Sequence, residues 1–271
     1  MALPCVMIGS LGVSKLIVGG NPLSGISHQS GDADGQMLDY FTVARIKEVL
    51  GECERRGINT LLARCDNFIA RVIHEYRREG GKMQWIAQSA PERKSLLDNA
   101  RMAAARGVDA FYVQGAHADE VGRTWTWQEF AEAIRVIRGL GMPAGAGSHT
   151  PTFHARRLER GIDLDFACQS LYNITGRTGK IEQHVDLQEL FVEEDRIAAL
   201  EAIAKIPEPV IAYKVLAAGR CDPRKSFQQL AAYLKPKDAV VVGIYNERQA
   251  NMVAEDVRLA EEYLGGREID G

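Results

Sequence analysis

Short apolar runs alternate along the chain with stretches of helical periodicity. Strands that are buried on both faces read as continuous apolar runs, and strands that alternate with helices imply parallel βαβ units. The expected strands are Leu16–Gly20, Ile58–Ala63, Met83–Gln88, Asp109–Gln114, Pro143–Gly147, Leu164–Gln169, Pro209–Lys214 and Ala239–Gly243. Eight such units in sequence predict an α/β fold of the (β/α)8 or TIM-barrel type.

The segment before the first barrel strand has a pattern of its own. Residues 3–15 read as two short strands around Gly9 and Ser10, and we expect a β-hairpin that plugs the amino-terminal end of the barrel. The apolar spacing after the first strand predicts a helix over Val43–Arg56. Gly57 follows it as a C-terminal stop, because glycine readily takes the left-handed conformation.

Two long connections follow expected strands. Residues Asn21–Phe41 are rich in Gly, Ser and Asp, and residues Asn173–Glu193 contain the sequence TGRTGK. Loops of more than about 12–15 residues without secondary structure are usually functional or disordered. Both connections are expected on the side of the barrel where substrates bind.

The composition is that of an ordinary globular chain, and the length of 271 residues suits a single barrel domain over residues 1–271. The formal charge of −3, without a basic run, argues against a nucleic-acid surface. No apolar stretch reaches the roughly 18 residues of a membrane span, and the start lacks the features of a secretory signal. Five dispersed cysteines without a CxxC pair indicate reduced thiols and a cytoplasmic protein.

The active sites of such barrels lie at the carboxyl ends of the strands. Polar residues gather at these positions and favour a site for a polyhydroxylated or anionic small molecule over a merely solvated rim. They are Asn21, Arg64, Asp66, Gln88, Gln114, His117, His149, Gln169, Asn173, Lys214 and Tyr245.

Lys214 is the sharpest single candidate among them. A lysine at a strand end, in a partly dry mouth, is able to acquire a lowered pKa and form a Schiff base with a carbonyl substrate. The alternative is a lysine that pairs with Asp66 or binds a substrate anion as a plain charge.

His117 and His149 follow neighbouring strands. They are expected to form an acid/base pair or to bind a divalent metal together with Asp66, although no HxH or HExxH spacing is present. His28 and His184 lie on the long connections and are placed to reach the same mouth.

Three further positions carry expectations. His154, like His74, reads as a helix-surface residue. Trp125 and Trp127 begin a helix and are placed to wall the pocket, although we expect one to pack in the core and the other to form a partly exposed lid. Gly145 and Gly147 in the fifth strand leave room for a group close to the backbone.

Several segments resemble the aldo/keto reductase superfamily in order and spacing. They are LGVSKLIVGG at the start, ECERRGINTLLA, Cys168–Asn173 with its Gln, two residues, then Tyr-Asn, Val210–Gly219, and VVGIYNERQANMVAEDV near the end. The resemblance covers nearly the whole chain and implies an aldo/keto reductase-like barrel.

The catalytic positions of the family are replaced. The resemblance places the family's Asp, Tyr, Lys and His at Asn59, about Arg64, Gln88 and Gln114. Reduction of a carbonyl needs a proton donor beside the oxygen, and neither an amide nor a guanidinium supplies an acidic proton. Ordinary aldo/keto reduction is therefore not expected.

The family's cofactor positions are mixed. The resemblance assigns cofactor binding to Lys214, Leu216, Gly243, Arg248 and Gln249. Gln249 agrees with the family pattern and Arg248 is able to meet a 2′-phosphate. Tyr245 and Val253, however, stand where a basic residue and an Asn are usual, and Lys214 where Ser is usual. NADP and a divalent metal both stay open as cofactors.

Three functions remain open at this point. The first is a non-redox enzyme of isomerase or lyase type, which acts on a small carbonyl or sugar-like metabolite through His117, His149 and Lys214. The second is an NAD(P)-dependent oxidoreductase with a displaced proton donor such as Tyr172, Tyr213 or Tyr245. The third is a non-catalytic binding protein. The sequence names neither the substrate nor the oligomeric state.

Overall fold

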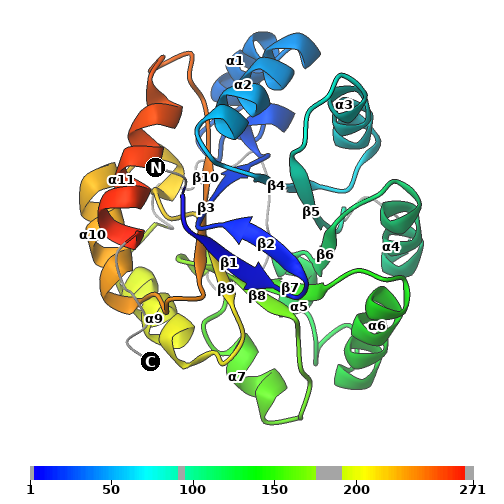
Figure 1. The fold of residues 1–271 in the computed structure, drawn as a ribbon. Coiled ribbons are helices and arrows are strands. Elements are labelled where there is room, and N and C mark those ends of the chain that lie inside the picture. The colour runs from blue at the N-terminus through cyan, green and yellow to red at the C-terminus, as the bar shows by residue number, and fades with distance from the viewer. Residues whose placement is uncertain (1–2, 91–94, 175–190, 266–271) are drawn as a thin grey trace.

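A closed barrel of eight parallel strands forms the centre of the molecule in the computed structural model, which describes residues 3–90, 95–174 and 191–265 (Figure 1). Around the barrel the strands follow the order β10-β3-β4-β5-β6-β7-β8-β9. Their bounds are β3 Leu16–Gly19, β4 Thr60–Arg64, β5 Gln84–Gln88, β6 Ala110–Val113, β7 Ala144–Ser148, β8 Phe166–Ser170, β9 Val210–Tyr213 and β10 Ala239–Gly243. The predicted barrel is confirmed, with each boundary within two residues of the expected one.

Helices surround the barrel and bury one face against it (Figure 1). In α2, Thr42 caps the first turn through the Arg45 N–H, and Ile46, Leu50 and Cys53 lie in the buried stripe. The helices are α1 Gly31–Tyr40, α2 Val43–Arg55, α3 Asn67–Arg78, α4 Leu96–Ala105, α5 Gly115–Asp119, α6 Trp127–Gly139, α7 Phe153–Leu158, α9 Glu193–Lys205, α10 Pro223–Tyr233 and α11 Met252–Leu264, with short 3-10 turns at Pro22–Ser24 and Ala217–Gly219. None of the helices within the described ranges is long and apolar enough to cross a membrane.

The predicted hairpin is also present. Strands β1 (Cys5–Ile8) and β2 (Leu11–Ser14) pair antiparallel and lie across one end of the barrel (Figure 1). Their buried side chains Val6, Ile8 and Val13 join the cluster formed by the inward-facing residues of the barrel strands. Because this end is closed by apolar side chains, only the opposite end is open to a ligand.

The long connection Asn21–Phe41 differs from its expectation as a structureless loop. It contains the helix α1, although Gly and Asp are poor helix formers. Ser30 caps the helix by accepting from the Ala33 N–H, and Ala33 and Met37 are buried against the core. Tertiary packing and the cap therefore override the weak propensity. Most of the second connection, residues 175–190, lies outside the described residues.

Three smaller expectations concern a histidine, two tryptophans and two glycines, and their outcomes differ. His154 is fully buried, where it accepts from the Arg157 Nε. Trp125 and Trp127 are both half-buried and pack edge-on against Phe130 at the edge of the core, and neither lines the cavity. Gly145 and Gly147 do leave room for groups close to the backbone: the Phe166 ring lies 2.6 Å from where a Cβ of Gly145 would be, and the Gly115 nitrogen lies 3.1 Å from that of Gly147.

Candidate active site

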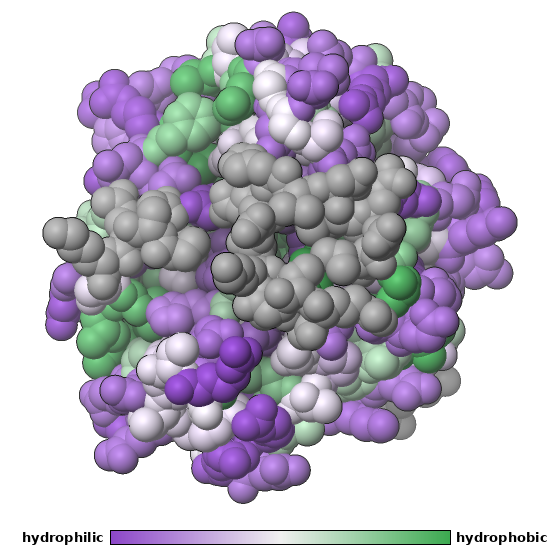
Figure 2. Space-filling view, turned by 180° about the vertical axis from the view of Figure 1, so that it is seen from behind, coloured by the Kyte–Doolittle hydropathy of each residue, from purple (hydrophilic) through white to green (hydrophobic). Residues whose placement is uncertain are grey.

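A cavity of about 530 Å³ opens at the carboxyl ends of the strands. Figure 2 shows the face opposite the hairpin, whose rim carries mainly hydrophilic residues. Seven of the polar residues expected at the mouth line this cavity: Asn21, Arg64, Gln88, Gln114, His149, Lys214 and Tyr245. The five residues expected at a cofactor also line it: Lys214, Leu216, Gly243, Arg248 and Gln249. The structure therefore brings most of the predicted residues into one space.

His117 and Asp66 do not line the cavity, contrary to the prediction. The His117 ring stacks on Trp125 with 4.6 Å between the ring centroids, and the indole donates to the His117 carbonyl. Asp66 caps α3 by accepting from the Ile69 N–H at 2.8 Å and lies 3.5 Å from the Arg64 guanidinium. Both side chains have structural roles on the helices that follow their strands.

Gln169 and Asn173 also lie apart from the cavity. The Gln169 amide is buried and donates to the carbonyls of Ser148 and Ser170. The backbone of Asn173 donates to Asp195 at the start of α9. Both positions were expected to contact substrate, and neither is among the residues that line the cavity.

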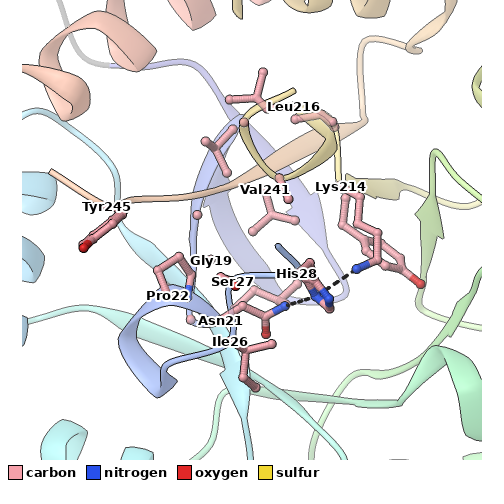
Figure 3. A pocket seen from close by; sticks show the side chains of 18 of the residues that line it. Gly19, Asn21, Pro22, Ile26, Ser27, His28, Lys214, Leu216, Val241 and Tyr245 are labelled. Atoms are coloured by element: carbon pink, nitrogen blue, oxygen red, sulfur yellow. Dashed lines mark hydrogen bonds between the residues drawn. The ribbon is translucent and has the colours of Figure 1, made fainter. Parts of the chain in front are cut away.

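Lys214 lies within a hydrogen-bonded chain in the cavity (Figure 3). Its Nζ is 2.9 Å from the His28 Nε2, and the Asn21 Nδ2 is 3.1 Å from the same nitrogen. Because both neighbours are N–H donors, His28 is neutral and accepts through Nε2. His28 thus reaches the mouth from its loop as expected, while His184 lies outside the described residues.

The surroundings of Lys214 favour the neutral amine. Burial, followed by the positive charge of Arg220, lowers the pKa of Lys214 to about 7. Burial and the nearby charge of Lys214 likewise hold the pKa of His28 well below its usual range. No carboxylate forms an ion pair with Lys214 in the described part of the chain, and Asp66 pairs with Arg64 instead. The alternative of a Lys214–Asp66 pair is therefore wrong.

The backbone at Lys214 and His28 adopts an unfavourable conformation that holds their hydrogen bond in place. Lys214 has φ +59° and His28 has φ +55°, values that residues with a Cβ rarely adopt. Ala217 and Ala218 in the same loop as Lys214 also have positive φ. Such strain persists only where the surrounding structure enforces it, and it often occurs at functional sites.

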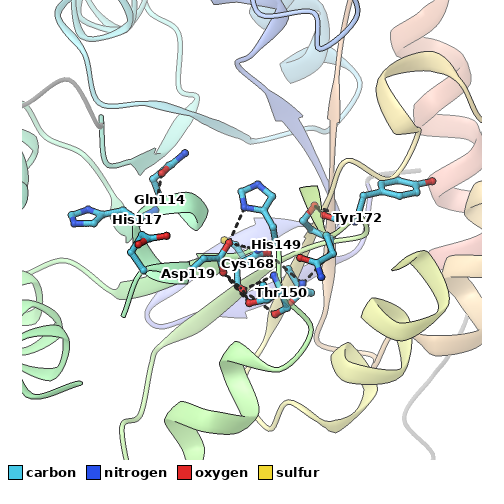
Figure 4. Close-up of polar contacts among 12 residues, drawn as sticks. Gln114, His117, Asp119, His149, Thr150, Cys168 and Tyr172 are labelled. Carbon is cyan, nitrogen blue, oxygen red and sulfur yellow. Dashed lines mark hydrogen bonds and ion pairs between the residues drawn. The ribbon is translucent and has the colours of Figure 1, made fainter. Parts of the chain in front are cut away.

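His149 is oriented by a carboxylate that the sequence reasoning missed (Figure 4). Asp119 accepts from the His149 Nδ1 at 3.1 Å, from the His149 backbone N–H at 3.1 Å and from the Ser148 hydroxyl at 2.6 Å. This contact places the proton on Nδ1 and leaves Nε2 as the second functional nitrogen. Asp119 lies in α5 after the fourth barrel strand, and its position in the sequence does not show that its side chain turns toward His149.

The electrostatics of the His149–Asp119 pair follow from its burial. Burial lowers the pKa of His149, and the hydrogen bond with Asp119 offsets part of that effect. For Asp119 burial raises the pKa, but the hydrogen bonds from His149 and Ser148 outweigh it and leave the pKa below its ordinary value. At neutral pH the pair is therefore a neutral imidazole beside a carboxylate.

The expected metal triad is not assembled. His149 lies in the cavity, whereas His117 and Asp66 lie away from it on α5 and at the start of α3. Across residues 3–90, 95–174 and 191–265 no three His, Cys, Asp or Glu side chains are grouped as metal ligands. The His117–His149–Asp66 expectation is therefore contradicted within the described chain.

The hydroxyl groups of the three tyrosines considered as displaced proton donors are all hydrogen-bonded to other groups of the protein. Tyr213 donates to the Ser148 carbonyl, and burial raises its pKa well above the usual value. Burial and the contact with Glu247 raise the pKa of Tyr245 to about 12. Tyr172 does not line the cavity and contacts Cys221. None of these tyrosines has the lowered pKa of a good proton donor.

One placement drawn from the family resemblance is wrong. Asn59 lies at the amino-terminal side of β4, where its amide donates to the Gly12 carbonyl and its Oδ1 accepts from the Ser14 N–H. It anchors the hairpin at the closed end of the barrel. A residue at that end has no access to a substrate at the mouth.

Comparison with known proteins reveals similarity in structure only. No family profile matches the sequence, and no curated protein matches it significantly. Two structures from Pseudomonas aeruginosa, provisionally assigned as aldo-keto reductases, are similar with TM-scores of 0.62 and 0.59 and identities of 17% and 16%. The first alignment covers 96% of this chain and 95% of the other, and the second covers 94% of each.

A third similar structure is that of the BexX/CysO complex of Amycolatopsis orientalis. The alignment has a TM-score of 0.57 and 17% identity, and it covers 99% of each chain. At these identities the likeness concerns the backbone alone. The chain has an aldo/keto reductase-like TIM-barrel fold.

Proposed function

We propose that this protein is an enzyme that acts on a small carbonyl or sugar-like metabolite by non-redox chemistry, with Lys214 forming an imine with the substrate. The observation that carries the proposal is the Nζ of Lys214. It lines the cavity, its pKa is lowered to about 7, and its hydrogen-bond partner is the neutral His28. A lysine in this state is a nucleophile at neutral pH.

The reaction begins with the attack of the neutral Nζ on the carbonyl carbon. A C–N bond forms, the carbonyl oxygen takes up a proton, and water then leaves to give a protonated imine. The positive nitrogen withdraws electrons from the neighbouring carbon, so a C–H or C–C bond there breaks more readily. Addition of water reverses the first steps and releases the product from Lys214.

His149 is the proposed proton carrier for these steps. It is buried, it lines the cavity, and its Nδ1–H is held by Asp119. The fixed tautomer leaves Nε2 to accept a proton from the reacting carbon and to return it. Asp119 acts through His149 and is a positioning residue.

The side chains around the two reacting groups favour a hydroxylated substrate. The amides of Gln88, Gln114 and Asn21 line the cavity and pair well with hydroxyl groups. Arg64 adds a positive charge at the end of β4 that suits an anionic group. The proposed partner is therefore a small molecule, and the proposed location is the cytoplasm.

A second candidate is an NAD(P)-dependent oxidoreductase. The observation in its favour is that the other four residues expected at a cofactor line the same cavity as Lys214. The Arg248 guanidinium and Gln249 amide suit a nucleotide phosphate at the outer part, and the cofactor would supply hydride. The residues near Lys214 suit hydride transfer poorly, because the hydroxyl groups of the three candidate tyrosines are already hydrogen-bonded to other protein groups.

Two assays separate the candidates. With a panel of aldoses, ketoses and keto acids, we expect turnover without added nicotinamide, lost in Lys214→Met. Loss of NADPH absorbance with the same panel supports the oxidoreductase instead. If neither assay gives turnover, and Lys214→Met and His149→Ala leave the cellular effects of the protein unchanged, the chain is a non-catalytic binding protein.

A further inference from the structure

Helix α11 carries a buried carboxyl group without a structural partner. Its buried face is otherwise mostly apolar and includes Val253, Val257 and Ala260. Asp256 lies in this face with 4% of its surface exposed, and its Oδ2 has no hydrogen-bond partner in the described structure. Burial of an unpaired polar group costs free energy, so the fold alone gives no reason for an acid here.

The usual structural roles of a helical Asp do not apply to this residue. The N-cap of α11 is Asn251, so Asp256 lies beyond the capping positions. No salt bridge involves Asp256 in the described chain. The adjacent Glu255 is satisfied differently, since it accepts from the side chains of Gln249 and Asn251.

Asp256 is among the residues that line the cavity, as are Met37, Val242 and Leu259. The last three residues come from α1, β10 and α11, and all three are apolar. Burial, with a smaller contribution from Glu255, raises the pKa of Asp256 to about 7. The carboxyl group also acts on Cys53 of α2, whose pKa it helps to raise.

We propose that the cavity beside Asp256 is a binding site for an organic ammonium group, with the Asp256 carboxylate as its counter-ion. The apolar side chains of Met37, Val242 and Leu259, which line the same cavity, suit the alkyl part of such a ligand. An ammonium supplies the missing donors and the missing positive charge together. An anion is repelled by Asp256 and Glu255, and a neutral hydroxyl satisfies the hydrogen bond without the charge.

The test compares n-butylammonium with n-butanol by calorimetric titration of the whole protein at about pH 8.5, where the amine is still protonated. The two probes share their alkyl chain and differ in charge. We expect the ammonium to bind about tenfold more tightly than the alcohol, as hydrogen bonds to charged groups contribute more than neutral ones. Asp256→Asn should remove that difference and leave the affinity for the alcohol unchanged.

Glu261→Gln is the matched control, because it removes an exposed carboxylate of the same helix that does not line the cavity, and it should change either affinity by less than about twofold. If Asp256→Asn does not fold, the pH dependence of ammonium binding by the native protein tests the proposal instead. Its ammonium affinity should fall between about pH 8.5 and pH 5.5 as the carboxylate of Asp256 becomes protonated. Equal affinities for the two probes, absence of ammonium binding, or a flat pH profile would overturn the proposal.

Discussion

At the scale of the residue, the site depends on how neighbouring groups set the charge of Lys214. The Nζ of this lysine faces His28, which is neutral, and Arg220 disfavours a second positive charge nearby. His149 faces Asp119, which keeps a carboxylate beside a neutral imidazole. One amine and one imidazole, each held by its own partner, are therefore available in the same cavity.

Lys214 also affects stability, and the sign of the effect follows from its pKa. In the unfolded chain the pKa is the ordinary 10.5, whereas in the fold it is about 7. Between these values the unfolded state binds more protons, so the contribution of Lys214 to stability rises with pH. We expect Lys214→Met to raise the melting temperature at about pH 6, where the buried charge is unfavourable.

The gain in melting temperature should shrink as the pH increases from about 7 toward 10.5, because the lysine of the folded protein is neutral in this range. Thermal unfolding of both proteins across this range measures the difference directly. An equal difference at all pH values would contradict the lowered pKa of Lys214.

His149 and Asp119 predict a second pH effect, on catalysis. His149→Gln should remove the limb of the pH–rate profile that belongs to the imidazole, whereas Asp119→Asn should lower the rate by about 10²-fold or more without removing the base. The Asn amide favours the wrong tautomer of His149, so its main effect should be on kcat. Unchanged profiles in both variants would show that the pair has no part in catalysis.

At the scale of the element, the strands were predictable because barrel strands are buried on both faces, which leaves continuous apolar runs such as those of β8 and β10. Helix α1 was not predictable, since its sequence GDADGQMLDY has poor helix propensity. The helix depends on the Ser30 cap and on burial of Met37. The burial of His154 was equally hidden, because its partner Arg157 is itself held by Glu208, which is distant in the sequence.

That partner network joins α7 to the segment before β9. The fully buried Arg157 binds Glu208 through two contacts of 2.8 and 2.6 Å and also contacts His154. Breaking a buried pair by removing one member leaves an uncompensated charge. We therefore expect Glu208→Ala to lower the free energy of unfolding by about 3–5 kcal/mol.

Denaturant unfolding of this variant measures the change. Glu159→Ala is the control, since its side chain is 72% exposed and its contact with Arg160 is long at 3.7 Å. A change below about 1 kcal/mol is expected there, as for other surface pairs. Equal effects of the two substitutions would contradict a structural role for the Arg157–Glu208 pair.

At the scale of the whole molecule, the site results from closing the barrel. The hairpin fills one end, and loops from distant parts of the chain meet at the other, which brings His28 next to Lys214 across 186 residues of sequence. The rule that barrel strands end at the active site correctly placed Lys214, His149 and Gln88 at the cavity. It failed for His117 and Gln169, because position after a strand does not fix which way a side chain points.

The central claim is that Lys214 forms an imine with a carbonyl substrate. The most direct measurement is mass spectrometry of the protein after incubation with the carbonyl panel and reduction by borohydride, which converts an imine into a stable amine. We predict a mass increase on the peptide that contains Lys214, absent in Lys214→Met. Labelling that is absent throughout the panel, or equal on exposed lysines such as Lys82, would contradict the account.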